Sequence, residues 1–211
     1  MAFPLTHLLV SDELLTRKPR CETEAAQFLL GSLAPDAVHY RENIILGPTK
    51  KISHLCPVSD EPWGKVTAND EWAEIVIAFA RSNPDSLAQG YATHCLTDIF
   101  TNKTLWMKFR TQHPQEWEKG YKSGYYQDLR NIDARLFLEI KPDIFSLLAK
   151  AKATDIPGLV SADEIQAIQH NILYVQYKVP PAAPCREYFY VTYDETMDLI
   201  QKAADFVEEN L

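Results

Sequence analysis

Apolar residues recur at helical spacing through most of the chain, and the longest such run lies near its middle. After residues 83–86 the apolar positions include Tyr91, Leu96 and Ile99, and the pattern continues towards residue 110. Apolar residues cover most of the circumference of this segment, which is typical of a buried helix. We expect it to be the central helix of the fold.

Shorter segments repeat the helical pattern on both sides of this helix. Cap-type residues at 11–13 and 69–71 mark two starts, and capping boxes at 161–164 and 192–195 mark two more. Pro19 cuts the first helix short, because proline removes a backbone donor and clashes with the preceding turn. The predicted helices begin near residues 11, 23, 69, 86, 125, 144, 161 and 192, with the second interrupted at Pro35.

Three stretches lack the helical pattern. Residues 41–62 carry prolines and a glycine without clean periodicity, which predicts a long loop, and loops of this length are often functional. Residues 179–184 are the clearest loop, and residues 188–191 form the one strand-like segment, without an obvious partner. The pattern therefore predicts an all-α fold, with one helical domain over residues 1–211.

Size and charge limit the functional classes. The chain has 211 residues, of which 46% are hydrophobic, and a net charge of −8, so it can form a sizeable core. No block of Lys and Arg is long enough to predict stable nucleic-acid binding. No apolar run reaches the roughly 18 residues of a membrane span, and residues 1–7 lack a signal-peptide pattern. With four dispersed cysteines and no C-x-x-C, a cytoplasmic protein with reduced thiols is expected.

A histidine and an aspartate on the central helix are the first candidates for chemistry. His94 and Asp98 are four residues apart, so their side chains share one face of the helix. On a buried helix such groups need partners, because an unpaired buried charge is very costly. The partner is either a divalent cation or the pair itself, through a His–Asp hydrogen bond. Imidazole and carboxylate together are a zinc-type ligand set.

Four segments, taken in order, resemble the motifs of a known family. They are residues 4–7 (PLTH), 28–39 (FLLGSLAPDAVH), 51–54 (KISH) and 90–99 (GYATHCLTDI). In this series the first half of the chain resembles the zinc-dependent phospholipase C family, which is related to the P1-type nucleases. The resemblance implies an all-helical bundle of that type and one or two bound zinc ions.

The resemblance also implies a ligand set. One zinc would take Asp36, His54, His94 and Asp98. A second would share Asp98 and take His7, with the amine and carbonyl of the chain's N-terminus as further ligands. Since no signal peptide is visible, the amine would belong to the first or second residue, and we expect the site at His7 to be the weaker one.

Other residues depart from the family pattern or stand beside it. The third zinc of the family uses a His six residues after the helix Asp, and here that residue is Thr104. The third site is therefore missing or rebuilt, with Asp128 or Asp133 as candidate replacements. His39 is expected to support the ligand residues or to be structural, and direct binding of metal is the less favoured alternative. Asp36 is the candidate catalytic residue, which would orient the attacking water or accept its proton.

Three functional classes follow. The first is a metal-dependent hydrolase that cleaves a phosphoester, most naturally a phosphodiester, by zinc-activated water, with a small phosphoester or a phospholipid headgroup as substrate. The second is a non-catalytic helical protein that keeps the metal for stability. The third is a metal-free helical binding module. Arg41, Lys50 and Lys51 could contact a phosphate but are expected to be solvated surface charges.

Overall fold

Helices make up nearly all of the regular structure. The computed structural model describes residues 3–61, 63–177 and 187–211. Within these ranges there is no strand, and the β pairing is confined to one isolated bridge between Ile156 and Val160. The predicted all-α fold class is confirmed. No helix in these ranges is both long and apolar enough to cross a membrane.

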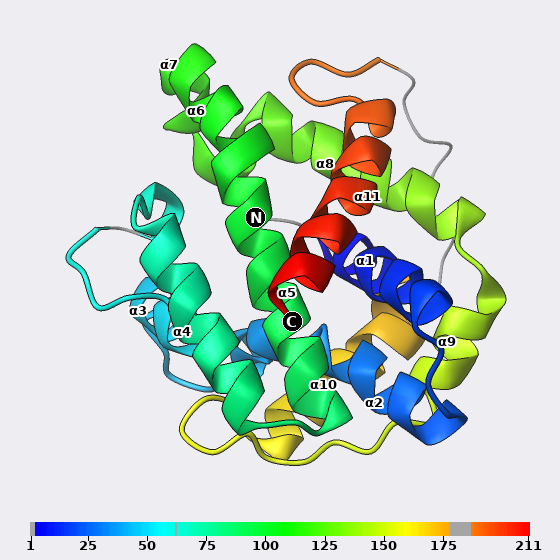
Figure 1. Ribbon diagram of the computed structural model, residues 1–211. Helices are drawn as coiled ribbons and strands as arrows, with labels where there is room; N and C mark the ends of the chain where they lie inside the picture. The colour runs from blue at the N-terminus through cyan, green and yellow to red at the C-terminus, as the bar shows by residue number, and fades with distance from the viewer. Residues whose placement is uncertain (1–2, 62, 178–186) are drawn as a thin grey trace.

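The predicted central helix is α5 (Ser86–Thr101), which runs through the middle of the molecule (Figure 1). The Asp85 carboxylate accepts a hydrogen bond from the backbone N–H of Ala88 at 3.0 Å and starts the helix. Every residue of α5 is buried except Ser86, Gln89 and Phe100. The helix continues through a π-helical turn into α6, so the prediction that it extends towards residue 110 is confirmed.

Four helices pack directly around α5: α1 (Pro4–Arg17), α2 (Glu22–Gly31), α4 (Asn69–Ser82) and α11 (Tyr193–Asn210). The remaining α-helices are α3 (Leu46–Ser53), α6 (Met107–Gln112), α7 (Pro114–Trp117), α8 (Gly124–Glu139), α9 (Pro142–Leu148) and α10 (Ala162–Asn171). The 3-10 turns are η1 (Ala34–Tyr40), η2 (Trp63–Lys65) and η4 (Gly120–Lys122), and the π-helical turns are η3 (Asn102–Trp106) and η5 (Ile172–Gln176). One core runs through these elements and includes Leu5, Leu30, Trp72, Tyr91, Ile165 and Ala203.

Local sequence signals set several boundaries as predicted. Ser161 with Glu164 and Thr192 with Glu195 form complete capping boxes at the starts of α10 and α11. α1 ends at Arg17, two residues before Pro19. In each case the signal lies within a few residues of the boundary it sets.

Two boundaries differ from the prediction. Ser11 does not cap the first helix, because α1 already begins at Pro4 and Ser11 is buried within it; proline at the first helical position has its φ angle set for a helix. The predicted loop 41–62 contains α3, whose eight residues hold Gly47 and Pro48 in the first turn. Proline is tolerated there, since the first N–H groups of a helix have no partner within it.

Residues 188–191 do not form a strand. The Asp128 carboxylate of α8 accepts hydrogen bonds from the backbone N–H groups of Phe189, Tyr190 and Val191 at 2.6 to 3.2 Å. A buried carboxylate thus takes the place of a neighbouring strand. The predicted loop 179–184 lies outside the described residues.

Candidate metal centre

The five predicted ligand residues converge from four separate elements. His7 lies on α1, Asp36 on η1, His54 at the C-cap of α3, and His94 and Asp98 on α5. Their ligand atoms form two groups, one of His7, His94 and Asp98 and one of Asp36, His54 and His94, with all atoms of a group within 4.8 Å of one another. His94 belongs to both groups, so the structure joins them into one centre.

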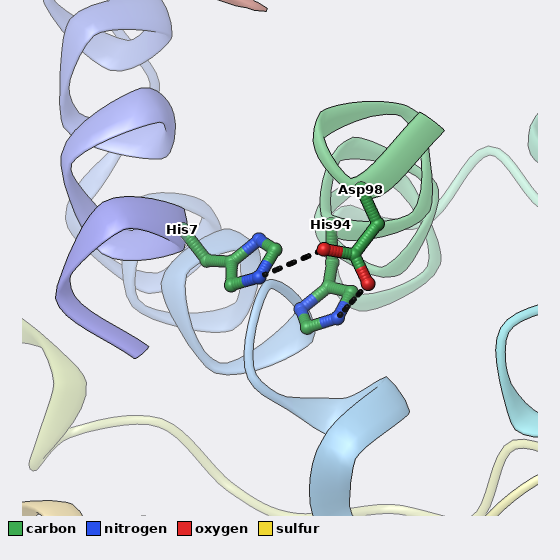
Figure 2. Close-up of side chains that lie close together, drawn as sticks. All are labelled: His7, His94 and Asp98. Carbon is green, nitrogen blue, oxygen red and sulfur yellow. Dashed lines mark ion pairs between the residues drawn. The ribbon is translucent and has the colours of Figure 1, made fainter. Parts of the chain in front are cut away.

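Asp98 belongs to the group of His7 and His94, and one of its oxygens also faces His54 of the other group. Its Oδ1 is 3.6 Å from Nε2 of His7, and its Oδ2 is 3.6 Å from Nε2 of His54. Nε2 of His94 lies 3.9 Å from the same Oδ2 (Figure 2). The two oxygens therefore face histidines of both groups, although only His94 belongs to both; the resemblance implies that Asp98 would be shared between two zinc ions.

The hydrogen bonds of His54 and His94 assign their tautomers. Nδ1 of His94 lies 2.7 Å from the carbonyl oxygen of Ser32, and Nδ1 of His54 lies 2.9 Å from that of Lys50. A carbonyl oxygen only accepts, so both Nδ1 atoms carry the proton and both Nε2 atoms carry a lone pair. The two Nε2 atoms are 3.2 Å apart. Two lone pairs cannot bond each other, whereas a cation beside them satisfies both.

His7, on α1, completes the group that contains His94 and Asp98. Its ring stacks on that of His94 with centroids 3.6 Å apart and planes within 9°, and both rings point at Asp98 (Figure 2). Within the described residues neither ring nitrogen of His7 has a hydrogen-bond partner. Burial, reinforced by the neighbouring His94, holds the pKa of His7 well below its usual value. The ring is therefore neutral, as a metal ligand must be.

The protonation states of the other ligands also suit a cation. Burial lowers the pKa of His54 to about 4, and burial likewise lowers the pKa of His94. Burial by itself raises the pKa of Asp36, but the neighbouring Lys50 ammonium outweighs it, and the pKa lies well below its usual value. The pKa of Asp98 is also lowered, against the opposing effect of burial. Neutral imidazoles thus face ionised carboxylates.

One side of the centre opens into a cavity of about 500 Å³. His7, His54, His94 and Asp98 are at most 1% exposed, whereas the side chain of Asp36 is 18% exposed and lies in the cavity wall. The wall is largely apolar or aromatic and includes Phe3, Leu46, Tyr121, Tyr126, Ile168 and Ile172. Asp36 is therefore the ligand that a molecule in the cavity would meet.

The remaining predicted site residues lie apart from the ligand atoms. His39 lines the cavity with Nε2 3.8 Å from Oδ1 of Asp36, and it belongs to neither ligand group. Asp128 accepts the backbone hydrogen bonds described above, Asp133 accepts one from the Tyr177 hydroxyl at 2.7 Å, and Thr104 donates to a helical carbonyl. Among the described residues none of these three joins a ligand group, so no third site forms around them. The expected N-terminal amine lies outside the described residues.

Sequence analysis missed Lys50. This lysine was expected to be a solvated surface charge, but it is only 4% exposed, and its Nζ lies 2.7 Å from Oδ1 of Asp36. Spacing offered a signal, because Lys50 precedes His54 by four residues and so shares its face of α3. Arg41 instead pairs with Glu164, and Lys51 donates to the carbonyl of Ser59 at 2.6 Å.

Imidazole nitrogens combined with carboxylate oxygens suit zinc and related transition metals better than calcium or magnesium, which prefer oxygen ligands. The donor set therefore fits the group that the sequence led us to expect. Comparisons with protein-family models, with curated proteins and with solved structures gave no match for this chain. What the chain does is thus inferred from the chemistry of this centre.

Proposed function

We propose that the protein is a metal-dependent phosphoester hydrolase built on a helical domain of the phospholipase C and P1 nuclease type. The observation that carries the proposal is the pair of facing Nε2 atoms of His54 and His94, 3.2 Å apart, with Asp36 beside them in the wall of a cavity. Such a donor set suits zinc, with one side left for water and substrate.

Bound zinc would supply a water of near-neutral pKa and positive charge for the phosphoryl oxygens. The chain's own residues supply the rest. Asp36 lies in the cavity wall, where its ionised carboxylate orients the attacking water and accepts its proton. Asp98 lies deeper, where its two oxygens hold the two halves of the centre together.

The cavity favours an ester of a sizeable organic group. Its volume of about 500 Å³ lies within the range of small-molecule sites, and its aromatic and aliphatic wall would cover an apolar leaving group. The phosphoryl group would lie beside Asp36 in the cavity wall. A phosphodiester fits best, because it joins a phosphoryl group for the metal ligands to organic groups for the apolar wall. It could be a free small molecule or a phospholipid headgroup.

Two measurements on protein purified without chelator test the proposal. Elemental analysis should find zinc, and turnover of bis(p-nitrophenyl) phosphate should depend on it. Asp36→Asn should abolish turnover, whereas His170→Ala, an exposed histidine outside the centre, should leave it unchanged. Zinc without turnover of this or other phosphoesters would assign the metal a structural role. Absence of metal even after zinc reconstitution would overturn the metal centre itself.

A further inference from the structure

Lys50 is a buried ammonium at the boundary between the ligand atoms and the cavity. Its backbone carbonyl accepts the hydrogen bond from Nδ1 of His54 at 2.9 Å, and its Nζ lies 2.7 Å from Oδ1 of Asp36. The Trp63 ring centroid lies 5.3 Å from the same Nζ, and this ring also packs edge-on against His54. The side chain is therefore held by Asp36 and Trp63 beside the candidate metal centre.

The composition of the cavity wall makes this charge distinctive. Among the described residues that line the cavity, Lys50 is the only Lys or Arg. His39 also lines it, near Asp36. Among the described lining residues, an anion that enters the cavity therefore meets one permanent positive charge, beside Asp36.

The ammonium has more hydrogen-bonding capacity than Asp36 uses. A lysine ammonium carries three N–H donors, and its ion pair with one oxygen of Asp36 leaves donors for a further anion. Charge balance points the same way. By formal charge, two aspartates and one lysine stand in and beside the ligand groups, Asp36, Asp98 and Lys50, so a centre loaded with one or two divalent ions would be net positive. A phosphoryl group would neutralise that excess.

We infer that Lys50 binds a phosphoryl oxygen of the substrate and so supplies positive charge from a protein side chain beside the ligand atoms. This inference rests on the proposed function. It assigns Lys50 as the phosphate-binding residue of the site and orients the substrate, with the phosphoryl group between Lys50 and the ligand atoms and the organic group along the apolar wall.

The test uses inorganic phosphate as the probe and zinc-loaded, full-length protein. Isothermal titration should show that Lys50→Met weakens phosphate binding by about 10- to 100-fold, the effect of removing a charged hydrogen bond. Lys51→Met is the matched control: it makes the same change in net charge one residue away, at a side chain that donates to Ser59 and is not part of the cavity wall. Its phosphate affinity should stay within about twofold of the parent.

Turnover and metal content complete the test. In Lys50→Met, kcat/KM for bis(p-nitrophenyl) phosphate should fall by a similar factor while the zinc content stays the same. Unchanged phosphate affinity would overturn the assignment, and so would loss of zinc from the folded variant, because Lys50 would then merely position Asp36. If Lys50→Met does not fold, Lys50→Gln carries the same comparison, since it keeps a donor for Asp36.

The two proposals fail separately. If the zinc-loaded parent turns over no phosphoester but binds phosphate more tightly than the Lys50 variant, the hydrolase proposal fails and the phosphate-binding role of Lys50 stands. If turnover is present and equal in both proteins, the hydrolase proposal stands and Lys50 is not the phosphate-binding residue.

Discussion

Gly31 of α2 and Gly90 of α5 meet backbone to backbone where the two helices cross. A Cβ atom built on Gly31 would lie 3.0 Å from the Cα of Gly90 and 2.0 Å from the carbonyl oxygen of Leu87. The absence of both side chains lets the helices approach closely. That approach brings the carbonyl of Ser32, the residue after Gly31, within 2.7 Å of Nδ1 of His94. A close helix contact therefore fixes the orientation of a candidate metal ligand.

Replacing Gly90 by alanine should destabilise the fold. The new Cβ would lie 2.0 Å from the carbonyl oxygen of Phe28, so α2 and α5 would have to separate. We expect a loss of about 2–4 kcal/mol in the free energy of unfolding, measured by urea denaturation. Gly47→Ala in α3 is the control, since no atom lies within 4 Å of its Cβ. It should be neutral or stabilising by up to about 1 kcal/mol. Equal stability of the two variants would show that the helices can part at no cost.

The shared position of His94 predicts different metal contents for two histidine variants. The parent should hold about one to two equivalents of zinc by elemental analysis. His94→Ala should lose nearly all of it, because His94 contributes to both ligand groups. His7→Ala should lose only the zinc held by the group of His7, His94 and Asp98. Full zinc content in His94→Ala would contradict the shared role.

Removing metal should lower the melting temperature, because the ligands tie four elements together. A ligand that binds only the native state adds about 2.7 kcal/mol when its free concentration is 100 times its Kd. Differential scanning calorimetry with zinc and with chelator measures this difference. Asp36→Asn, which removes one charged ligand, should show a smaller response to chelator than the parent. The same melting temperature with zinc and with chelator would show that metal does not hold these elements together.

Asp133 predicts a pH effect that is independent of metal. Burial raises the pKa of this carboxyl from 3.8 to about 6, although the Tyr177 hydroxyl partly opposes the shift. The folded state thus holds the proton more tightly than the unfolded state. The resulting stabilisation is complete at low pH and is lost as the pH rises through about 6, and it amounts to at most about 3 kcal/mol.

Asp133→Asn mimics the protonated carboxyl at every pH. In the presence of chelator it should therefore be more stable than the parent at pH 7, by about 1–3 kcal/mol, and nearly equal to it at pH 4. Urea denaturation of both proteins between pH 4 and pH 8 checks the sign. A difference that does not change with pH would show that the carboxyl does not titrate with a raised pKa.

Sequence by itself determined the helical class and many of the boundaries. Capping boxes, prolines and apolar periodicity act within a few residues, so the starts of α10 and α11 and the burial of α5 could be predicted. His94 and Asp98 were also visible as candidates, because His and Asp on an apolar helix need partners wherever the rest of the chain lies, whereas His7, Asp36 and His54 came from the family resemblance. Local signals failed for α3, where glycine and proline in the first turn hide a short helix.

Tertiary structure decided what these residues do together. Whether His94 belongs to one ligand group or two depends on how α1, η1 and α3 pack against α5, and no local pattern encodes that packing. The same holds for Lys50, which is buried because α3 turns it towards Asp36. It also holds for Asp128, whose carboxylate accepts hydrogen bonds from backbone N–H groups 61 to 63 residues further along the chain. Distances between segments are set by contacts across the core, such as the backbone contact of Gly31 with Gly90, and these exist only once the chain is folded.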